Sequence, residues 1–247
     1  MTTTTVIRCR GIGEPAANAP TLLHQVTDRL PRDRYRPIEL AWSAQYGPVP
    51  ATAGESFASA LADGRIRLLQ EIEKAPGPVA LLGYSGGASL AGNVAQEIGR
   101  GDHPHLAGKV TAAGLVADPA MPRGQAANGS FGVTGDRHTD GIPTRWLWDE
   151  RDPIPCTPDR SPLRTIADQT SAMSLVDPAA WGADLLDRLR RGRWQPSAWD
   201  WRDVIGSIQR YGHAIEQAQF YLTGGHVSAY LGAPLGSLTR WLVDETR

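Results

Sequence analysis

Residues 83–87 read GYSGG, a G-x-S-x-G motif that places a serine between glycines. An almost wholly apolar run, residues 79–82, precedes the motif, and a helical pattern follows it. A serine that joins a buried strand to a helix must turn sharply. Its hydroxyl then projects at the helix N-terminus, where N–H groups and the helix dipole favour developing negative charge. We therefore predict that Ser85 is a nucleophile; an ordinary Gly/Ser-rich turn is the other interpretation.

A serine hydroxyl needs a base to accept its proton, and a histidine further along the chain would serve. His226 follows two glycines and precedes the last predicted helix, which gives the chain order serine, acid, histidine of α/β-hydrolases. The other histidines fall in predicted helices or polar loops: His24, His103, His105, His138 and His213. The loop that contains two of them has no clear third metal ligand, so we expect no metal site. We predict that His226 is the base.

The third group should be a carboxylate that orients the imidazole, placed after a strand between the serine and the histidine. Asp152 comes just after the apolar residues 146–148 and is the leading candidate. Asp149 is its main rival, and Asp118, after the preceding strand, could act as the acid or cap a turn instead.

Such chemistry also needs N–H donors for the negative charge on the substrate oxygen. One donor should be the backbone N–H of Gly86, directly after the serine. The second should come from the loop after the first strand, residues 10–14 (RGIGE), where the N–H of Ile12 is best placed. Two glycines near a strand end can also be merely a turn.

Alternating strand and helix patterns must position these groups. We predict strands at 6–9, 36–42, 79–82, 110–117 and 144–148, the second at a sheet edge because it contains Pro37. Helices are expected at 21–30, 54–74, 88–99, 177–191, 197–222 and 236–246. This alternation predicts a parallel sheet flanked by helices, joined by right-handed crossovers.

The chain changes character after Cys156, and we find no convincing strand between residues 161 and 222. We therefore predict a core of residues 1–156 plus 223–247 and an inserted helical subdomain of residues 157–222. Four of the eight tryptophans fall in the insert: Trp181, Trp194, Trp199 and Trp201. Apolar residues recur there at helical spacing, namely Trp201, Ile205, Ile208, Tyr211, Ile215 and Leu222. The tryptophans could contact lipid or form the insert's own core.

Composition narrows the function classes. The 247 residues are 41% hydrophobic and 21% charged, as in an ordinary globular protein, and a net charge of −1 excludes a general electrostatic grip on nucleic acid. No apolar run approaches about 18 residues, so no transmembrane helix is expected, and the N-terminus lacks the pattern of a secretory signal. Cys9 and Cys156 are expected to be buried thiols, although a bridge between them stays possible.

Four motifs in this order resemble those of cutinase-like serine esterases: residues 9–15, 83–88, 117–119 and 152–156. The helical stretch between Asp152 and His226 is similar to the insertion in the Lysin B proteins of mycobacteriophages. This resemblance implies a cutinase-like α/β-hydrolase fold without a cofactor, in which Ser85, Asp152 and His226 form a triad and Ile12 supplies an oxyanion donor. It also implies hydrolysis of the ester between mycolic acids and arabinogalactan in phage-mediated host lysis.

The chain departs from that pattern at four positions. Gly86 stands where glutamine is common, Ile12 where serine or threonine is usual, and Arg151 where cutinases have glycine; Pro155 is an extra residue. A general cutinase- or lipase-type carboxylesterase and a phage tail component on a hydrolase scaffold are the alternative functions. The lysis function implies a protein made in the host cytoplasm that acts at the envelope after release, or one carried in the virion.

Overall fold

One parallel sheet forms the centre of the molecule in the computed structural model, which describes residues 3–16, 19–47, 54–170 and 199–247. The five strands lie in the order β2-β1-β3-β4-β5, and every neighbouring pair is parallel. Their bounds are β1 (Thr4–Cys9), β2 (Tyr35–Glu39), β3 (Val79–Tyr84), β4 (Val110–Val116) and β5 (Thr144–Leu147). The predicted strands and the edge position of Pro37 are confirmed.

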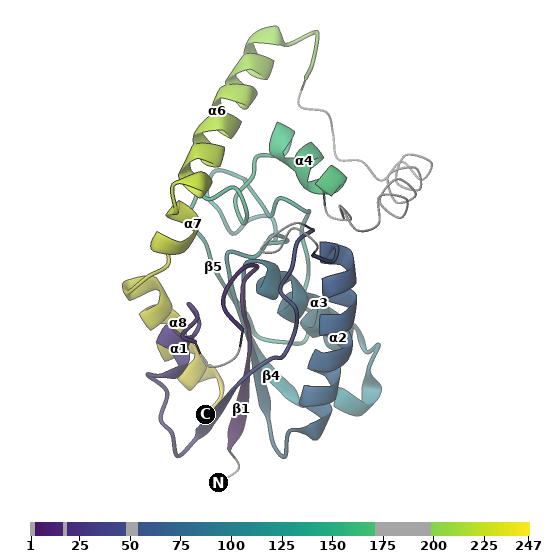
Figure 1. Ribbon diagram of the computed structural model, residues 1–247, viewed down its shortest axis with the longest axis vertical. Coiled ribbons are helices and arrows are strands. Elements are labelled where there is room, and N and C mark those ends of the chain that lie inside the picture. The colour runs from purple at the N-terminus through teal and green to yellow at the C-terminus, as the bar shows by residue number, and fades with distance from the viewer. Residues whose placement is uncertain (1–2, 17–18, 48–53, 171–198) are drawn as a thin grey trace.

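Helices cover both faces of the sheet (Figure 1). The helices are α1 (His24–Thr27), α2 (Phe57–Lys74), α3 (Gly86–Arg100), α4 (Pro162–Thr170), α6 (Val204–Leu222), α7 (Gly225–Ser228) and α8 (Ala233–Glu245), with a 3-10 turn at Pro104–Leu106. Helices α2 and α3 pack on one face and α1 and α8 on the other, so two apolar clusters enclose the sheet. Every residue of β3 is buried, because this central strand has neighbours on both edges and helices on both faces.

The helices differ from the prediction in several places, and the short α7 was not predicted. The expected helix 21–30 shrinks to α1, because the His24 ring accepts the N–H of Thr21 and local turns take up the remaining residues. Helix α4 was not predicted. Helix α6 begins at Val204, where the Asp203 side chain caps it by accepting the N–H of Gly206. The expected helix 177–191, Trp181, Trp194 and the expected cap Ser197 lie outside the described residues.

Helix α6 extends away from the sheet and returns the chain to it through α7 (Figure 1). Among the described residues of the predicted insert, α4 and α6 are its helices, and no strand occurs there. The two cysteines are buried in separate apolar clusters and are not bridged. Burial raises the pKa of both thiols, so they remain neutral packing groups.

Candidate active site

Ser85 occupies a sharp turn between the end of β3 and the start of α3. Its backbone has φ 53° and ψ −119°, a conformation that costs a non-glycine residue about 1–3 kcal/mol. The neighbouring structure holds it there: the Ser85 N–H donates to the carbonyl of Val116, and its own carbonyl accepts the N–H groups of Ala88 and Ser89. The sheet and the first turn of α3 therefore support the strained residue and aim its hydroxyl outward.

The flanking glycines of the motif are required by close backbone contacts. A Cβ at Gly83 would lie 2.5 Å from the Cα of Ala88, and one at Gly87 would lie 2.0 Å from the carbonyl oxygen of Cys9. Real side chains cannot approach backbone so closely, so only glycine fits at either position. The G-x-S-x-G pattern is thus a direct consequence of packing the turn against β1 and α3.

Three side chains from distant parts of the chain form one hydrogen-bonded line. The Oγ of Ser85 lies 2.9 Å from Nε2 of His226, and Nδ1 of His226 lies 2.7 Å from Oδ2 of Asp152. His226 is in the short helix α7, and Asp152 follows β5. Asp152 is fully buried, and its other carboxylate oxygen accepts the N–H of Ile154 at 3.0 Å. The structure thus brings the predicted nucleophile, base and leading acid candidate together.

The two rival carboxylates have other partners. Asp149 accepts two hydrogen bonds from the Arg151 guanidinium, which lowers the pKa of this carboxyl. Asp118 forms a buried ion pair with Arg137 and accepts the indole N–H of Trp146. The departure at Arg151 is therefore accommodated, since this exposed side chain pairs with Asp149 and lies over the Phe220 ring.

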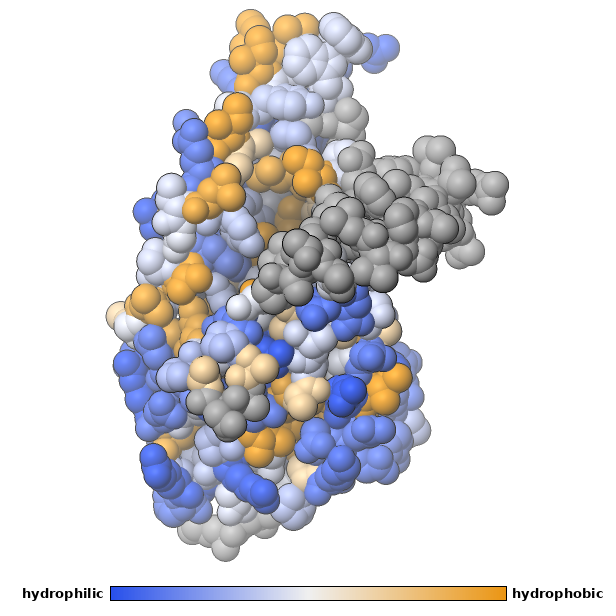
Figure 2. All heavy atoms as spheres, in the orientation of Figure 1, coloured by the Kyte–Doolittle hydropathy of each residue, from blue (hydrophilic) through white to orange (hydrophobic). Residues whose placement is uncertain are grey.

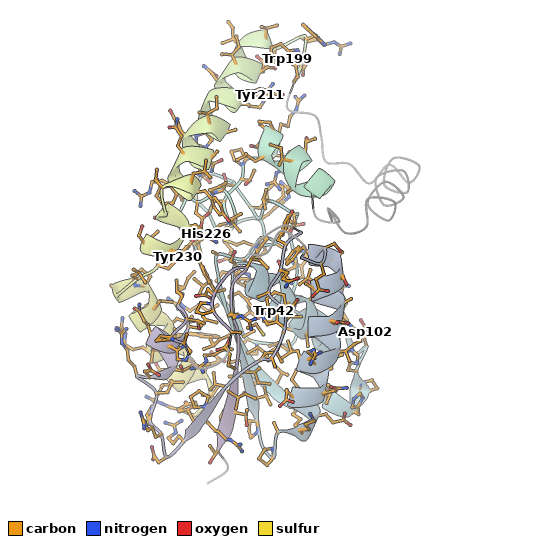
Figure 3. The ribbon with its side chains drawn as sticks, in the orientation of Figure 1. Trp42, Asp102, Trp199, Tyr211, His226 and Tyr230 are labelled. Carbon is orange, nitrogen blue, oxygen red and sulfur yellow. The ribbon has the colours of Figure 1, made fainter. Side chains whose placement is uncertain are left out.

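Two tyrosines that the sequence analysis did not single out support this line. The hydroxyl of Tyr230 donates to Oδ2 of Asp152 at 2.7 Å, and that of Tyr84 donates to the carbonyl of His226 at 3.0 Å. The Tyr84 ring also stacks on the imidazole at 5.3 Å. Burial raises the pKa of both phenols, so each remains a neutral donor. Tyr84 occupies the x position of G-x-S-x-G, which any residue can fill, and Tyr230 belongs to no motif. The sequence therefore contains no indication of a role for either tyrosine. Figure 3 shows Tyr230 beside His226.

The two predicted N–H donors lie on loops that touch. A Cβ at Gly86 would lie 2.6 Å from Cγ1 of Ile12, so the Ile12 side chain fills the space that a side chain at position 86 would need. Two departures from the cutinase-like pattern, isoleucine for a hydroxyl residue and glycine for glutamine, are therefore complementary. Neither amide donates a hydrogen bond within the described part of the chain.

Two charged side chains, the half-buried Glu14 and the buried Arg10, hold the loop that carries Ile12. The carboxylate of Glu14 accepts the N–H of Gly11 at 2.6 Å and that of Leu22 at 2.7 Å. The guanidinium of Arg10 donates to the carbonyl oxygens of Trp42 and Leu40. These bonds connect the loop to the chain after β2 and to the start of the α1 region, which fixes its position beside Ser85.

The described residues contain no group of three or more His, Cys, Asp or Glu side chains that could hold a metal ion. His103 shares a loop with His105, and its ring instead forms a hydrogen bond with Glu97 at 2.9 Å. In the part of the chain that the structure describes, no helix combines the length and apolarity needed to cross a membrane.

The five-stranded parallel sheet, the serine turn after β3 and the order of Ser85, Asp152 and His226 along the chain define an α/β-hydrolase fold. No family model matches the chain, and no curated protein matches its sequence. The crystal structure of lysin B from mycobacteriophage D29 matches 98% of this chain and 99% of that chain, with 16% identity and a TM-score of 0.61. The chain therefore shares its fold with lysin B over nearly the full length of both.

Shorter proteins match with lower scores. The catalytic core domain of acetyl xylan esterase from Trichoderma reesei matches 85% of this chain and 98% of its own, at 14% identity and a TM-score of 0.47. A cutinase-like protein from Cryptococcus sp. matches 79% of this chain and 96% of its own, at 16% identity and a TM-score of 0.43.

The contact between Ile12 and Gly86 predicts coupled substitutions. Gly86→Ala should lower the free energy of unfolding by about 1–2 kcal/mol, because its methyl group enters the volume of Ile12. In the double variant Ile12→Ala/Gly86→Ala that overlap is removed, so urea unfolding of all four proteins should give a favourable coupling of about 1 kcal/mol.

Gly212→Ala is the matched control, because this glycine of α6 has open space around its Cβ position. It should be neutral or stabilise the protein by up to about 1 kcal/mol. Strict additivity of the substitutions at positions 12 and 86 would show that the two loops do not pack as described.

Proposed function

We propose that this protein is a serine esterase that hydrolyses carboxylic esters through an acyl-enzyme. The observation that carries the proposal is the line of hydrogen bonds from Ser85 through His226 to the buried Asp152, at 2.9 and 2.7 Å. A nucleophile, a base and an orienting carboxylate in this geometry form the constellation that activates a serine hydroxyl. No cofactor or metal is required for this reaction.

In the first half of the reaction, the Oγ of Ser85 attacks the ester carbonyl carbon, and Nε2 of His226 takes the hydroxyl proton. The carbonyl oxygen becomes negatively charged and is stabilised by the N–H groups of Ile12 and Gly86. The tetrahedral intermediate then collapses, and the imidazolium gives its proton to the departing alcohol. Ser85 is left acylated.

In the second half, His226 removes a proton from water, which attacks the acyl carbonyl and forms a second tetrahedral intermediate. Collapse returns the proton to Ser85 and releases the carboxylic acid. Asp152 remains ionised throughout, fixes the imidazole tautomer and stabilises the imidazolium.

The substrate we propose is the ester between mycolic acids and arabinogalactan in the mycobacterial envelope, cleaved during phage-mediated lysis. Two observations support this substrate: the fold is shared with lysin B from mycobacteriophage D29 along nearly the whole chain, and a helical insertion separates Asp152 from His226. The proposal places synthesis in the host cytoplasm and action at the envelope after release, or carriage in the virion.

Ser85→Ala should lower kcat/KM for a short-chain ester such as p-nitrophenyl butyrate by about 10⁴- to 10⁶-fold, because it removes the nucleophile. The far-ultraviolet circular dichroism and the thermal midpoint should remain close to those of the parent. Ser89→Ala, in the first turn of α3 after Ser85, is the control and should change the rate by less than about 3-fold. A Ser85→Ala protein with parental activity would exclude this mechanism.

The proposed substrate predicts release of free mycolic acid from purified mycobacterial envelopes, measured by mass spectrometry. The rate should be at least comparable to that on simple acyl esters, and Ser85→Ala should abolish it. Hydrolysis of simple esters without mycolate release would favour a general carboxylesterase. Stable assembly in purified phage particles, with normal lysis by phage carrying Ser85→Ala, would favour a tail component.

A further inference from the structure

Helix α6 exposes its apolar face to solvent and does not pack it against the core. Ordinary surface helices turn their apolar stripe toward the core, but the buried residues of α6 are Ser207, Ala214 and Gln217. Its large apolar residues are instead exposed by 42% to 80%: Val204, Ile205, Ile208, Tyr211, Ile215 and Leu222. Figure 2 shows hydrophobic residues gathered along this helix on the face in view. We call these six residues the α6 apolar face.

Polar contacts determine which side of α6 faces inward. The side-chain amide of Gln217 donates to the carbonyl of Cys156 at 2.7 Å. The hydroxyl of Ser207 donates to the carbonyl of Asp203 at 2.8 Å and accepts the N–H of Asp200 at 2.9 Å. Gln217 and Ser207 are 2% and 0% exposed. The Ser207 contacts lie at the start of α6, whereas the Gln217 bond ties the helix to the chain after β5. Rotating the helix to bury its isoleucines would break the Gln217 bond, so the exposure of the apolar face is part of the fold.

The α6 apolar face carries no charge along its length. At 100° per residue, its members occupy about one third of the helix circumference over about 28 Å of helix. Gly212 and Gln219 are the other residues in this arc, whereas Arg210, His213 and Glu216 fall outside it. A face that bound a polar or charged macromolecule would need groups to pair with it, and this one offers side chains that only an apolar surface can cover.

Aromatic residues stand at both ends of α6. Trp201 is 81% exposed and packs edge-on against Trp199, which in turn contacts Tyr211. Figure 3 shows Trp199 and Tyr211 together at the end of α6 that lies farthest from His226. At the other end of the helix, Tyr221 is 41% exposed. Tryptophan and tyrosine favour the boundary between an apolar layer and water.

The end of α6 lies beside the candidate active site. The Tyr221 ring lies 4.9 Å from the imidazole of His226. Leu222, the last member of the α6 apolar face, follows Tyr221 in the chain, and the exposed Val227 follows His226. Exposed apolar side chains therefore stand at the end of α6 and next in the chain to the group that would activate Ser85.

We propose that the α6 apolar face binds the acyl-chain surface of a lipid layer and holds the active site at its edge. This inference rests on the proposed function, because an ester of long acyl chains is presented at such a surface. Acyl chains require neither hydrogen bonds nor a complementary shape from the protein, which fits a face of branched aliphatic side chains bounded by aromatic residues. The tryptophans at 199 and 201 then lie at the outer end of a lipid-binding face.

The test compares binding of the full-length protein to phosphatidylcholine vesicles by flotation. Ile208→Gln/Ile215→Gln removes two apolar side chains but keeps good helix formers, so vesicle affinity should fall by at least about 10-fold. Hydrolysis of p-nitrophenyl butyrate should stay within about 2-fold of the parent, since neither residue contacts the triad. Ile66→Gln is the matched control, because Ile66 is 52% exposed on α2, and it should bind vesicles like the parent.

Several outcomes would overturn the proposal. The proposal fails if the parental protein does not float with the vesicles. It also fails if the double variant binds the vesicles as strongly as the parent. A thermal midpoint lowered by more than about 5 °C in the double variant would show that the face packs within the molecule. If the parental protein is a dimer and the double variant is a monomer, the α6 apolar face binds a second copy of the chain instead of lipid. If the parental protein binds vesicles but hydrolyses no ester, the proposed function fails while the lipid-binding face stands.

Discussion

The buried contact between His226 and Asp152 is the constraint on which the rest of the structure depends. These residues lie 74 positions apart, with the predicted insert between them, yet their side chains meet at 2.7 Å. The structure meets this constraint where the insert returns to the core. Gln217 of α6 donates to the carbonyl of Cys156, close to Asp152, and the next turns of chain deliver His226 through α7. The helical extension can therefore project outward without separating the imidazole from its carboxylate.

A fully buried carboxylate is costly unless hydrogen-bond donors surround it. Asp152 has three: His226 and Tyr230 on one oxygen and the N–H of Ile154 on the other. Tyr84 adds a bond to the backbone of His226 and stacks on its ring. The two tyrosines thus hold the base and its carboxylate in place beside Ser85.

The strands and the serine turn could be predicted because their signals are local: apolar runs of strand length, and glycines that close backbone contacts require. The sequence favoured Asp152 over Asp149 but could not decide between them, because both residues follow the same strand. Only the turn after that strand, in which Arg151 binds Asp149, gives the two carboxylates different surroundings. Tyr230 and the pairing of Ile12 with Gly86 depend on contacts between distant segments, which no local pattern encodes. For α6, periodicity predicted an apolar face, but what covers such a face depends on the tertiary structure.

Covalent labelling by a fluorophosphonate probe, with peptide mapping and rates for matched variants, tests the central claim most directly. The account predicts a single modified residue, Ser85, with labelling slowed by about 10³- to 10⁴-fold in Asp152→Asn and unchanged within about 3-fold in Asp149→Asn. Labelling of another residue, or equal slowing by the two asparagine variants, would contradict an active site built from Ser85, His226 and Asp152.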